Sequence, residues 1–213
     1  MHTRVINKHG LTIIDIRVGQ CHDIGNDFIV KNLDKKEFFP LFEKHRDSVF
    51  SQDHSLHFRN FLSEDENRKI KELGKNCYDQ PFQMNLAVFD KKENFVGWSF
   101  GWQDNSTTYY MCNSAILPEY RRNGIYSSLL KKNIQILSEM GFQLIYSRHN
   151  ATNNNVLIPK LKAGFIISKM EISDTFGCLV HLHYYTNKTR KKLMNYRSGE
   201  IAPDDELKKL FEM

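Results

Sequence analysis

The sequence predicts a mixed α/β fold: one domain of about 160 residues with a short addition at each end. Three observations predict it. Stretches with strand-like and helix-like periodicity alternate from residue 27 to residue 186. Two capping boxes mark helix starts in the first half, and Leu and Ile recur at steps of three and four before Gly141 in the second.

The first half begins with a predicted strand at 27–33 and continues with two helices. Asp34 with Glu37, and Ser63 with Glu66, form capping boxes, in which the first side chain accepts from the backbone three residues on. The order predicted for the whole domain is strand, two helices, three strands, helix, strand, helix and two strands.

The second half is richer in β-branched and aromatic residues, and its turns are marked by Gly, Pro and charged residues. The predicted elements are strands at 84–89, 95–102 and 107–117, a helix ending at Gly141, a short strand at 144–146, a helix at 153–163 stopped by Gly164, and two closing strands at 165–172 and 177–185.

Three regions follow from this pattern. Residues 1–26, with two β-like stretches within 3–18, form an N-terminal strand or hairpin extension, and residues 27–186 form the central domain. Residues 187–213 form a basic and then amphipathic helical extension, whose apolar edge would cover the domain or a second subunit of a homodimer.

The charge distribution argues against a nucleic-acid-binding domain. The chain has 213 residues, with 30 Lys and Arg against 25 Asp and Glu. Five of the basic residues lie in the acid-free segment 188–197, so the remainder is balanced at 25 of each sign. A nucleic-acid-binding domain carries its excess charge over a folded face. Contact with nucleic acid through 188–197 stays a hypothesis based on charge alone.

The composition also predicts a cytoplasmic protein with reduced thiols and no membrane or metal partner. No apolar run approaches the roughly 20 residues of a membrane span, and the first residues lack the apolar centre of a signal peptide. The four cysteines are far apart, and no CxxC or HExxH motif occurs.

The segment most indicative of chemistry is 115–130. An apolar strand ends at Pro118, a basic turn with Arg121 and Arg122 follows, and a helix begins after Gly124. The first N–H groups of a helix have no internal partner, so an anion such as phosphate can bind there, and glycine lets it approach the backbone. The alternative is an ordinary helix start with two solvated arginines.

This stretch resembles motif A of the GNAT superfamily of acyl-CoA-dependent N-acetyltransferases, written Arg/Gln-x-x-Gly-x-Gly/Ala. Arg121 and Gly124 match, whereas Tyr126 replaces the third small residue. A second segment, 153–165, resembles the family's Asn-x-x-Ala-x-x-x-Tyr-x-x-x-Gly-Phe pattern. Its matches are Asn153, Gly164 and Phe165, with Val156 at the Ala position and Lys160 at the Tyr position.

The resemblance implies a central, mostly antiparallel sheet whose fourth and fifth strands splay apart, flanked by helices. It implies acetyl-CoA as acyl donor, without a metal, and direct transfer of the acetyl group to a primary amine of a small molecule or peptide. The expected cofactor-binding residues are Ala115, Ile116, Arg121, Arg122, Asn123, Gly124, Ile125, Tyr126, Ser127 and Asn153. The alternative is a non-catalytic acyl-CoA-binding module with the same fold.

The catalytic acid and base do not follow from the sequence. Lys160 could donate a proton only if burial lowered its pKa, and a solvated helix lysine is the favoured interpretation. The stretches 107–115 and 143–149 contain no carboxylate. His149 in its neutral form and the phenols of Tyr110, Tyr126 and Tyr146 are the alternatives, and the acceptor amine has no signature.

Two further features favour packing over chemistry. Aromatic residues Phe95, Trp98, Phe100 and Trp102 are expected to pack in the core, with an aromatic wall for the acceptor as the alternative. Cys112 is expected to be a buried small side chain rather than a nucleophile, because no basic residue is adjacent.

Overall fold

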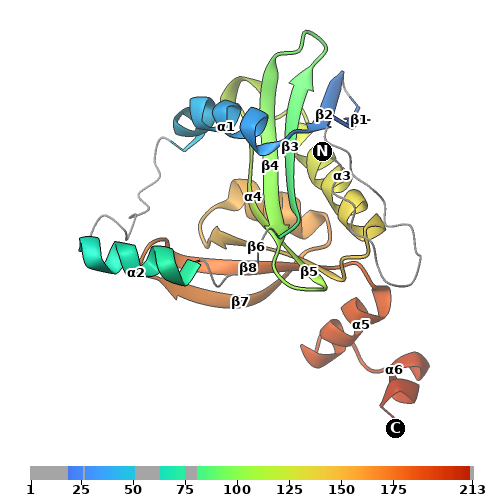
Figure 1. The fold of residues 1–213 in the computed structure, drawn as a ribbon. Coiled ribbons are helices and arrows are strands. Elements are labelled where there is room, and N and C mark those ends of the chain that lie inside the picture. The colour runs from blue at the N-terminus through green and yellow to red at the C-terminus, as the bar shows by residue number, and fades with distance from the viewer. Residues whose placement is uncertain (1–18, 26, 51–62, 75–80, 212–213) are drawn as a thin grey trace, which may run out of the picture.

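Eight strands pair into one open sheet in the computed structural model, which describes residues 19–25, 27–50, 63–74 and 81–211 (Figure 1). The strand order is β1-β2-β3-β4-β5-β6-β8-β7, and every pair is antiparallel except β5 with β6. The strands are β1 (Cys21–Asp23), β2 (Phe28–Asn32), β3 (Gln83–Asp90), β4 (Phe95–Gln103), β5 (Thr108–Ile116), β6 (Leu144–Asn150), β7 (Ile166–Ser173) and β8 (Gly177–Tyr185). The helices are α1 (Lys35–Val49), α2 (Glu64–Gly74), α3 (Ile125–Glu139), α4 (Asn154–Lys162), α5 (Lys188–Arg197) and α6 (Asp205–Leu210), with a 3₁₀ turn at Pro118–Tyr120.

The predicted capping boxes start the first two helices. The Glu37 N–H donates to the Asp34 carboxylate at 2.8 Å, and α1 follows. The Ser63 N–H donates to the Glu66 carboxylate at 2.8 Å, while the Glu66 N–H donates to the Ser63 hydroxyl at 3.3 Å before α2. Each box satisfies N–H groups that a helix start leaves without partners.

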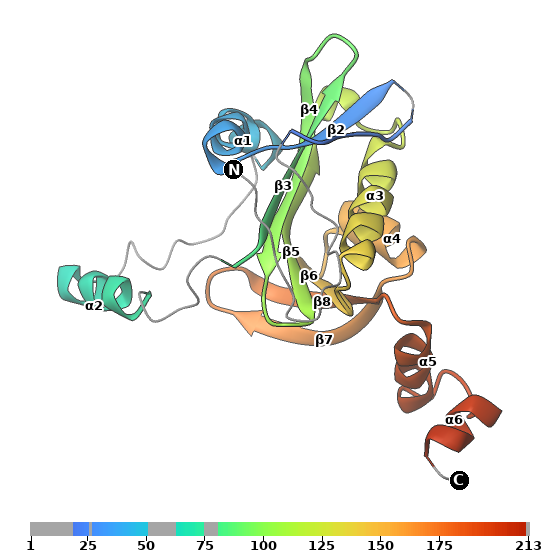
Figure 2. The same cartoon turned by 45° about the vertical axis from the view of Figure 1, so that its right-hand side comes forward.

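Two cores form on opposite faces of the sheet (Figure 2). On one face α3 and α4 pack against alternate residues of β3, β5, β6 and β8; on the other, α1 brings Phe38 against Trp98, Phe100 and Ala115. Trp98 is fully buried there, with ring contacts to Phe42 and Phe95. The core prediction is confirmed for Trp98 and Phe100, whereas Phe95 and Trp102 are only partly buried.

The mixed fold and the predicted element order from β2 to β8 are confirmed. β1 is an additional edge strand, and β6 runs to Asn150 rather than ending at residue 146. The strands predicted within 3–18 lie outside the described residues.

The two C-terminal helices hold each other through charge and one buried leucine. Lys192 on α5 pairs with Asp204 and with Glu206, at 2.6 Å from the latter, and Leu207 on α6 is buried. Carboxylates of the same chain therefore neutralise part of the positive charge of segment 188–197. In the described part of the chain, no helix combines the length and the apolar composition that a membrane crossing requires.

Candidate functional site

β5 and β6 run side by side only over their first three residues. The paired positions are Thr108 with Leu144, Tyr109 with Ile145 and Tyr110 with Tyr146. Beyond them β5 stays paired with β4 and β6 with β8. The facing edges of 111–116 and 147–150 therefore lack a strand partner within the described structure, which confirms the predicted splay and leaves room for an extended ligand.

A β-bulge lies where the two strands separate. Phe100 is opposite Asn113 and Gly101 is opposite Met111, so Cys112 is an extra residue on β5. A bulge bends its strand, which accounts for the divergence from β6. Gly101 is required there, because a Cβ atom on it would lie 2.1 Å from the carbonyl oxygen of Tyr110.

The bulge also reverses the alternation of side chains along β5. Met111 faces the α3 side. Regular alternation would put Ala115 on that same side, but Ala115 packs with the α1 core and Ile116 with the α3 core. After the bulge, the backbone groups that face the gap are therefore not the ones that uninterrupted alternation from Tyr109 and Met111 would place there.

The turn after β5 has the backbone of an anion-binding site. Arg122 and Gly124 adopt positive φ values of 65° and 74°, and Gly124 is the N-cap of α3 without any side-chain cap. The first turn of α3 contains no acidic residue, so its free N–H groups and the helix dipole favour a negative charge. A Cβ atom on Gly124 would meet nothing within 4 Å, so this backbone is open to a ligand.

The side chains of this turn divide into two roles. Arg121 donates from Nε to the carbonyl oxygen of Ile116 at 3.0 Å, which ties the turn to the end of β5. Arg122 and Ser127 are exposed. Tyr126 packs against the core between α3 and the sheet, and burial raises the pKa of its phenol. Its bulk therefore points away from the turn, and only its backbone faces a ligand there.

The second predicted segment begins α4. Asn153 is the N-cap of that helix, and its exposed side chain makes no capping hydrogen bond. The amide is thus available to a ligand at the β6 end of the gap.

Lys160 contradicts the prediction of a solvated helix lysine. Its side chain is 0% exposed, and Nζ donates to Ser147 Oγ at 2.7 Å and contacts Met111 Sδ at 3.2 Å. Burial lowers its pKa from the ordinary 10.5 to about 7. The reason is placement: α4 packs on the sheet where β5 and β6 separate, and Lys160 is on its inner side.

Ser147 connects this amine to His149. Ser147 Oγ lies 3.0 Å from Nε2 of His149, two residues further along β6 on the same side of the sheet. Burial, and then the charge of Lys160, lower the pKa of His149 to about 2, so the imidazole is neutral. His149 is partly exposed, whereas Ser147 and Lys160 are fully buried.

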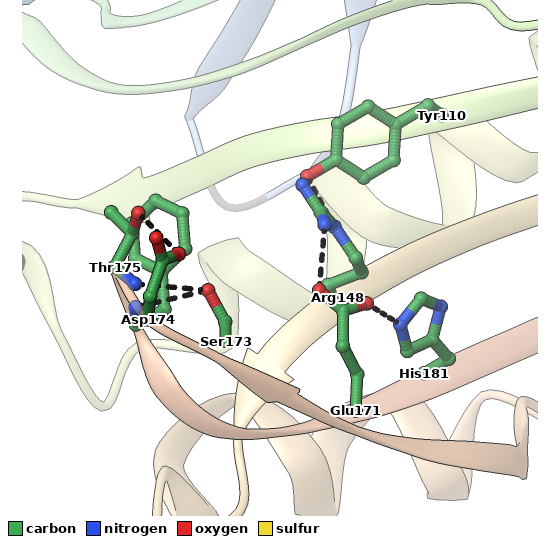
Figure 3. Close-up of polar contacts among 8 residues, drawn as sticks. Tyr110, Arg148, Glu171, Ser173, Asp174, Thr175 and His181 are labelled. Atoms are coloured by element: carbon green, nitrogen blue, oxygen red, sulfur yellow. Dashed lines mark hydrogen bonds and ion pairs between the residues drawn. The ribbon is translucent and has the colours of Figure 1, made fainter. Parts of the chain in front are cut away.

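Figure 3 shows a second polar cluster, around Arg148, whose side chain alternation along β6 directs to the face opposite Ser147 and His149. Arg148 donates to the Tyr110 hydroxyl at 3.3 Å and to the Glu171 carboxylate at 3.2 Å. The other oxygen of Glu171 lies 2.5 Å from Nε2 of His181. The His181 bond, followed by the charge of Arg148, lowers the pKa of Glu171. Close by, Ser173 caps the β7–β8 turn by accepting from the Thr175 N–H at 3.2 Å.

Aromatic rings extend this cluster. Tyr146 stacks on Tyr110 at 4.8 Å between centroids, and Trp102 meets Tyr110 edge-on at 5.1 Å. Burial raises the pKa of Tyr146 to about 12, so the phenol stays protonated. Sequence reasoning missed Glu171 because it searched for a carboxylate on β5 and β6. The alternation of His181 and His183 on the next strand was the available signal.

Cys112 is a packing residue, as predicted. Burial raises the pKa of its thiol to about 11, so it is a poor nucleophile. Among the described residues no group of three or more His, Cys, Asp or Glu side chains has the arrangement of a metal site.

Comparison with known proteins identifies the fold. A model described as the acetyltransferase (GNAT) family matches residues 36–165. A comparison with curated protein sequences gives no match.

Solved structures with the same architecture cover most of the chain. A spermidine/spermine N-acetyltransferase from Vibrio cholerae has a TM-score of 0.55 at 11% identity, covering 80% of this chain and 99% of its own. A ribosomal-protein-S18-alanine N-acetyltransferase from Escherichia coli has a TM-score of 0.54 at 14% identity, with 75% and 94% covered. The spermidine N-acetyltransferase of Vibrio cholerae in complex with CoA and spermine has a TM-score of 0.53 at 13% identity, with 76% and 97% covered. At these identities the likeness is one of fold.

Proposed function

We propose that this chain, which belongs to the acetyltransferase (GNAT) family, transfers an acetyl group from acetyl-CoA to a primary amine of a small molecule or a peptide. The family model spans residues 36–165, more than half of the 213. One observation carries the proposal: the unpaired edge of β5 leads directly into a glycine-capped helix start that no side chain occupies.

The residues present fit an acyl thioester with a pyrophosphate. The N–H groups from Arg122 to Ser127, including those of Asn123 and Ile125, would hold the pyrophosphate, helped by the exposed Arg122. Backbone groups of Ala115 and Ile116 on the free β5 edge would bond the extended arm, and the Asn153 amide would bond it from the β6 side. Tyr126 contributes through its backbone alone.

The chemistry that acetyl-CoA supplies is an acetyl group activated as a thioester. The chain's part is to orient an amine against it and to stabilise the negative charge that develops on the carbonyl oxygen. A backbone N–H on the free edge of β5 is suited to that role, since a fixed donor in a site without bulk water stabilises an oxyanion strongly. The amine must be neutral to attack, so a group nearby must take its proton.

The acceptor would reach the gap from the face that carries Glu171. That face combines the Tyr110 and Tyr146 rings with a carboxylate that Arg148 and His181 hold in place. An amine can donate to this carboxylate and lie against the rings. The similar structures named above include N-acetyltransferases for spermidine and for an alanine of ribosomal protein S18, and both acceptors are amines.

Two measurements test the proposal. Acetyl-CoA at about 100 times its Kd should stabilise the protein by roughly 2.7 kcal/mol, or about 5–10 °C in Tm. Gly124→Asp should abolish the shift, because it puts a side chain and a negative charge at the phosphate position. Gly141→Asp is the matched control, since Gly141 has a positive φ of 95° and equally open space at the other end of α3.

Thiol release across an amine panel then separates catalysis from binding. Release of free thiol from acetyl-CoA that depends on at least one amine supports the transferase function. A normal thermal shift without release from any amine would favour the acyl-CoA-binding module, and no shift in a folded sample would refute both.

Three broader assignments accompany the proposal. The catalytic unit is residues 27–186, since every strand from β2 to β8 lies within it. A cytoplasmic location suits the free thiols of Cys21, Cys112 and Cys178. A homodimer would cover the exposed apolar side chains of α4.

A further inference from the structure

Lys160 is a buried amine without a counter-ion. Among the described residues no carboxylate pairs with it, and its neighbours are Ser147, Met111 and the Phe165 ring, 5.0 Å from Nζ. A buried ammonium without an ionic partner costs several kcal/mol, so a stable fold retains one mainly where function uses it.

The position of this amine ties it to the gap. Met111 and Ser147 are the first residues after the last paired positions of β5 and β6. Lys160 Nζ contacts both, so it lies at the point where the strands separate. From there Ser147 leads to His149, which is partly exposed along the unpaired part of β6.

The hydrogen-bond directions form a continuous path. Lys160 Nζ donates to Ser147 Oγ, which leaves the Ser147 hydroxyl hydrogen free to go to Nε2 of His149. The imidazole hydrogen is then on Nδ1. Among the described residues, His149 is a titratable group that the charge of Lys160 reaches, and its low pKa keeps it neutral.

We propose that Lys160, Ser147 and His149 form a proton relay that protonates the sulfur leaving group of the transfer reaction. The inference rests on the proposed function. As the amine nitrogen bonds to the acetyl carbon, the C–S bond breaks and its electron pair stays on sulfur. His149 gives its Nδ1 proton to sulfur, takes one from Ser147, and Ser147 takes one from Lys160. The proton that the acceptor nitrogen loses leaves to solvent, and Lys160 regains one from solvent through the partly exposed His149 and Ser147 after the thiol departs.

The face of the sheet on which the relay lies determines whether it can reach the thiol or the acceptor amine. Ile145, Ser147 and His149 alternate onto the side packed by α3, whose N-terminus would hold the donor's phosphates. Arg148, which lies between Ser147 and His149 on β6, points to the other face, where it contacts Glu171 and where the acceptor would enter. His149 is therefore the catalytic residue on the thiol side, while Ser147 and Lys160 act through it as positioning residues.

NMR on the ligand-free protein tests the relay without relying on turnover. The lysine ¹³Cε signal that is lost in Lys160→Met should titrate near pH 7. The His149 ¹⁵N shifts should report the Nδ1–H tautomer and follow the Lys160 titration. Ser147→Ala should uncouple them. A Lys160 midpoint above pH 9, or His149 shifts unchanged by Ser147→Ala, would overturn the relay.

Kinetics with the best amine of the panel give a second reading. Lys160→Met and His149→Gln should lower kcat about 10²–10⁴-fold with the acetyl-CoA thermal shift retained, and Lys160→Met should remove the activity loss above pH 7. Lys162→Met, on the exposed side of α4, is the control expected to match wild type. A purely structural Lys160 would leave the pH profile unchanged. If acetyl-CoA gave no thermal shift with the wild-type protein, the proposed function itself would be refuted.

Discussion

Replacing Lys160 with Met should stabilise the protein near neutral pH. The side chain is fully buried, and burial lowers its pKa from 10.5 to about 7. Methionine keeps an unbranched apolar chain of similar length and removes the amine. The folded state then no longer has to desolvate or deprotonate this group.

The sign follows from proton binding. In the unfolded chain Lys160 holds its proton up to about pH 10.5, whereas the folded chain releases it near pH 7. Between these values the unfolded state binds more protons, so wild-type stability rises with pH. The cost of the buried amine is fully present below pH 7 and is gone above pH 10.5. At about 1.4 kcal/mol per pH unit it totals about 5 kcal/mol.

The hydrogen bond to Ser147 offsets part of this gain. Its loss costs about 1 kcal/mol, so Lys160→Met should exceed wild type by roughly 3–4 kcal/mol at pH 6.5. The advantage should shrink by roughly 1.4 kcal/mol per pH unit above pH 7. Urea unfolding at pH 6.5, 7.5, 8.5 and 9.5 measures it, with Lys162→Met as the control for an exposed lysine on the same helix.

Two results would refute the reasoning. A stability difference that stays constant from pH 6.5 to 9.5 would mean that the folded state does not release the proton. A variant less stable than wild type at pH 6.5 would mean that the amine's hydrogen bonds outweigh its desolvation.

Three other predictions concern the core, the acceptor face and the C-terminal helices. Trp98→Ala should cost about 3–5 kcal/mol in urea unfolding, because the ring is fully buried and donates to Asn113 at 2.8 Å; a cost under about 1 kcal/mol would contradict the packing. Glu171→Gln should raise KM for the amine several-fold and leave the acetyl-CoA thermal shift intact, because the substitution removes the ion pair with Arg148 and the negative charge facing the acceptor; an unchanged KM would exclude that role. Lys192→Ala should cost less than about 1 kcal/mol despite two ion pairs, because its partners are about half exposed; a larger loss would show coupling between the helices and the domain.

Signals that act over three or four residues were sufficient for most elements. Asp34 with Glu37 and Ser63 with Glu66 satisfy helix N–H groups locally, so the pattern predicts the start of each helix. The length of β6, by contrast, is not determined by its local sequence. Its polar residues after Tyr146 show no strand pattern, and they are extended because β8 pairs with them up to Asn150.

The placement of Lys160 ran against hydrophobic patterning. On α4 the side chains of Ile158 and Leu161 are 49% and 41% exposed, while Lys160 is 0% exposed. Hydropathy alone would turn this helix the other way. Only the packing of α4 over Ser147 shows which side is inward, and that depends on tertiary contacts.

The Glu171 cluster was equally non-local. It depends on the pairing of β7 with β8, which shifts register between Ile167 and Lys169. A shift of one residue moves a side chain to the other face. This irregularity has no residue signature that the sequence alone reveals.

The unpaired edge of β5 also fixes a distance within the site. Because Cys112 is bulged, the stretch from Met111 to Ile116 advances only as far as its partner from Gly101 to Gly97, four residues or about 13 Å at roughly 3.3 Å each. That length separates the buried amine at the start of the gap from the anion-binding turn at its end. It thereby sets how long an arm must join a donor's phosphates to its reactive carbon. Deleting one residue from this stretch would shorten the distance between the amine and the turn by about 3 Å and select a different donor.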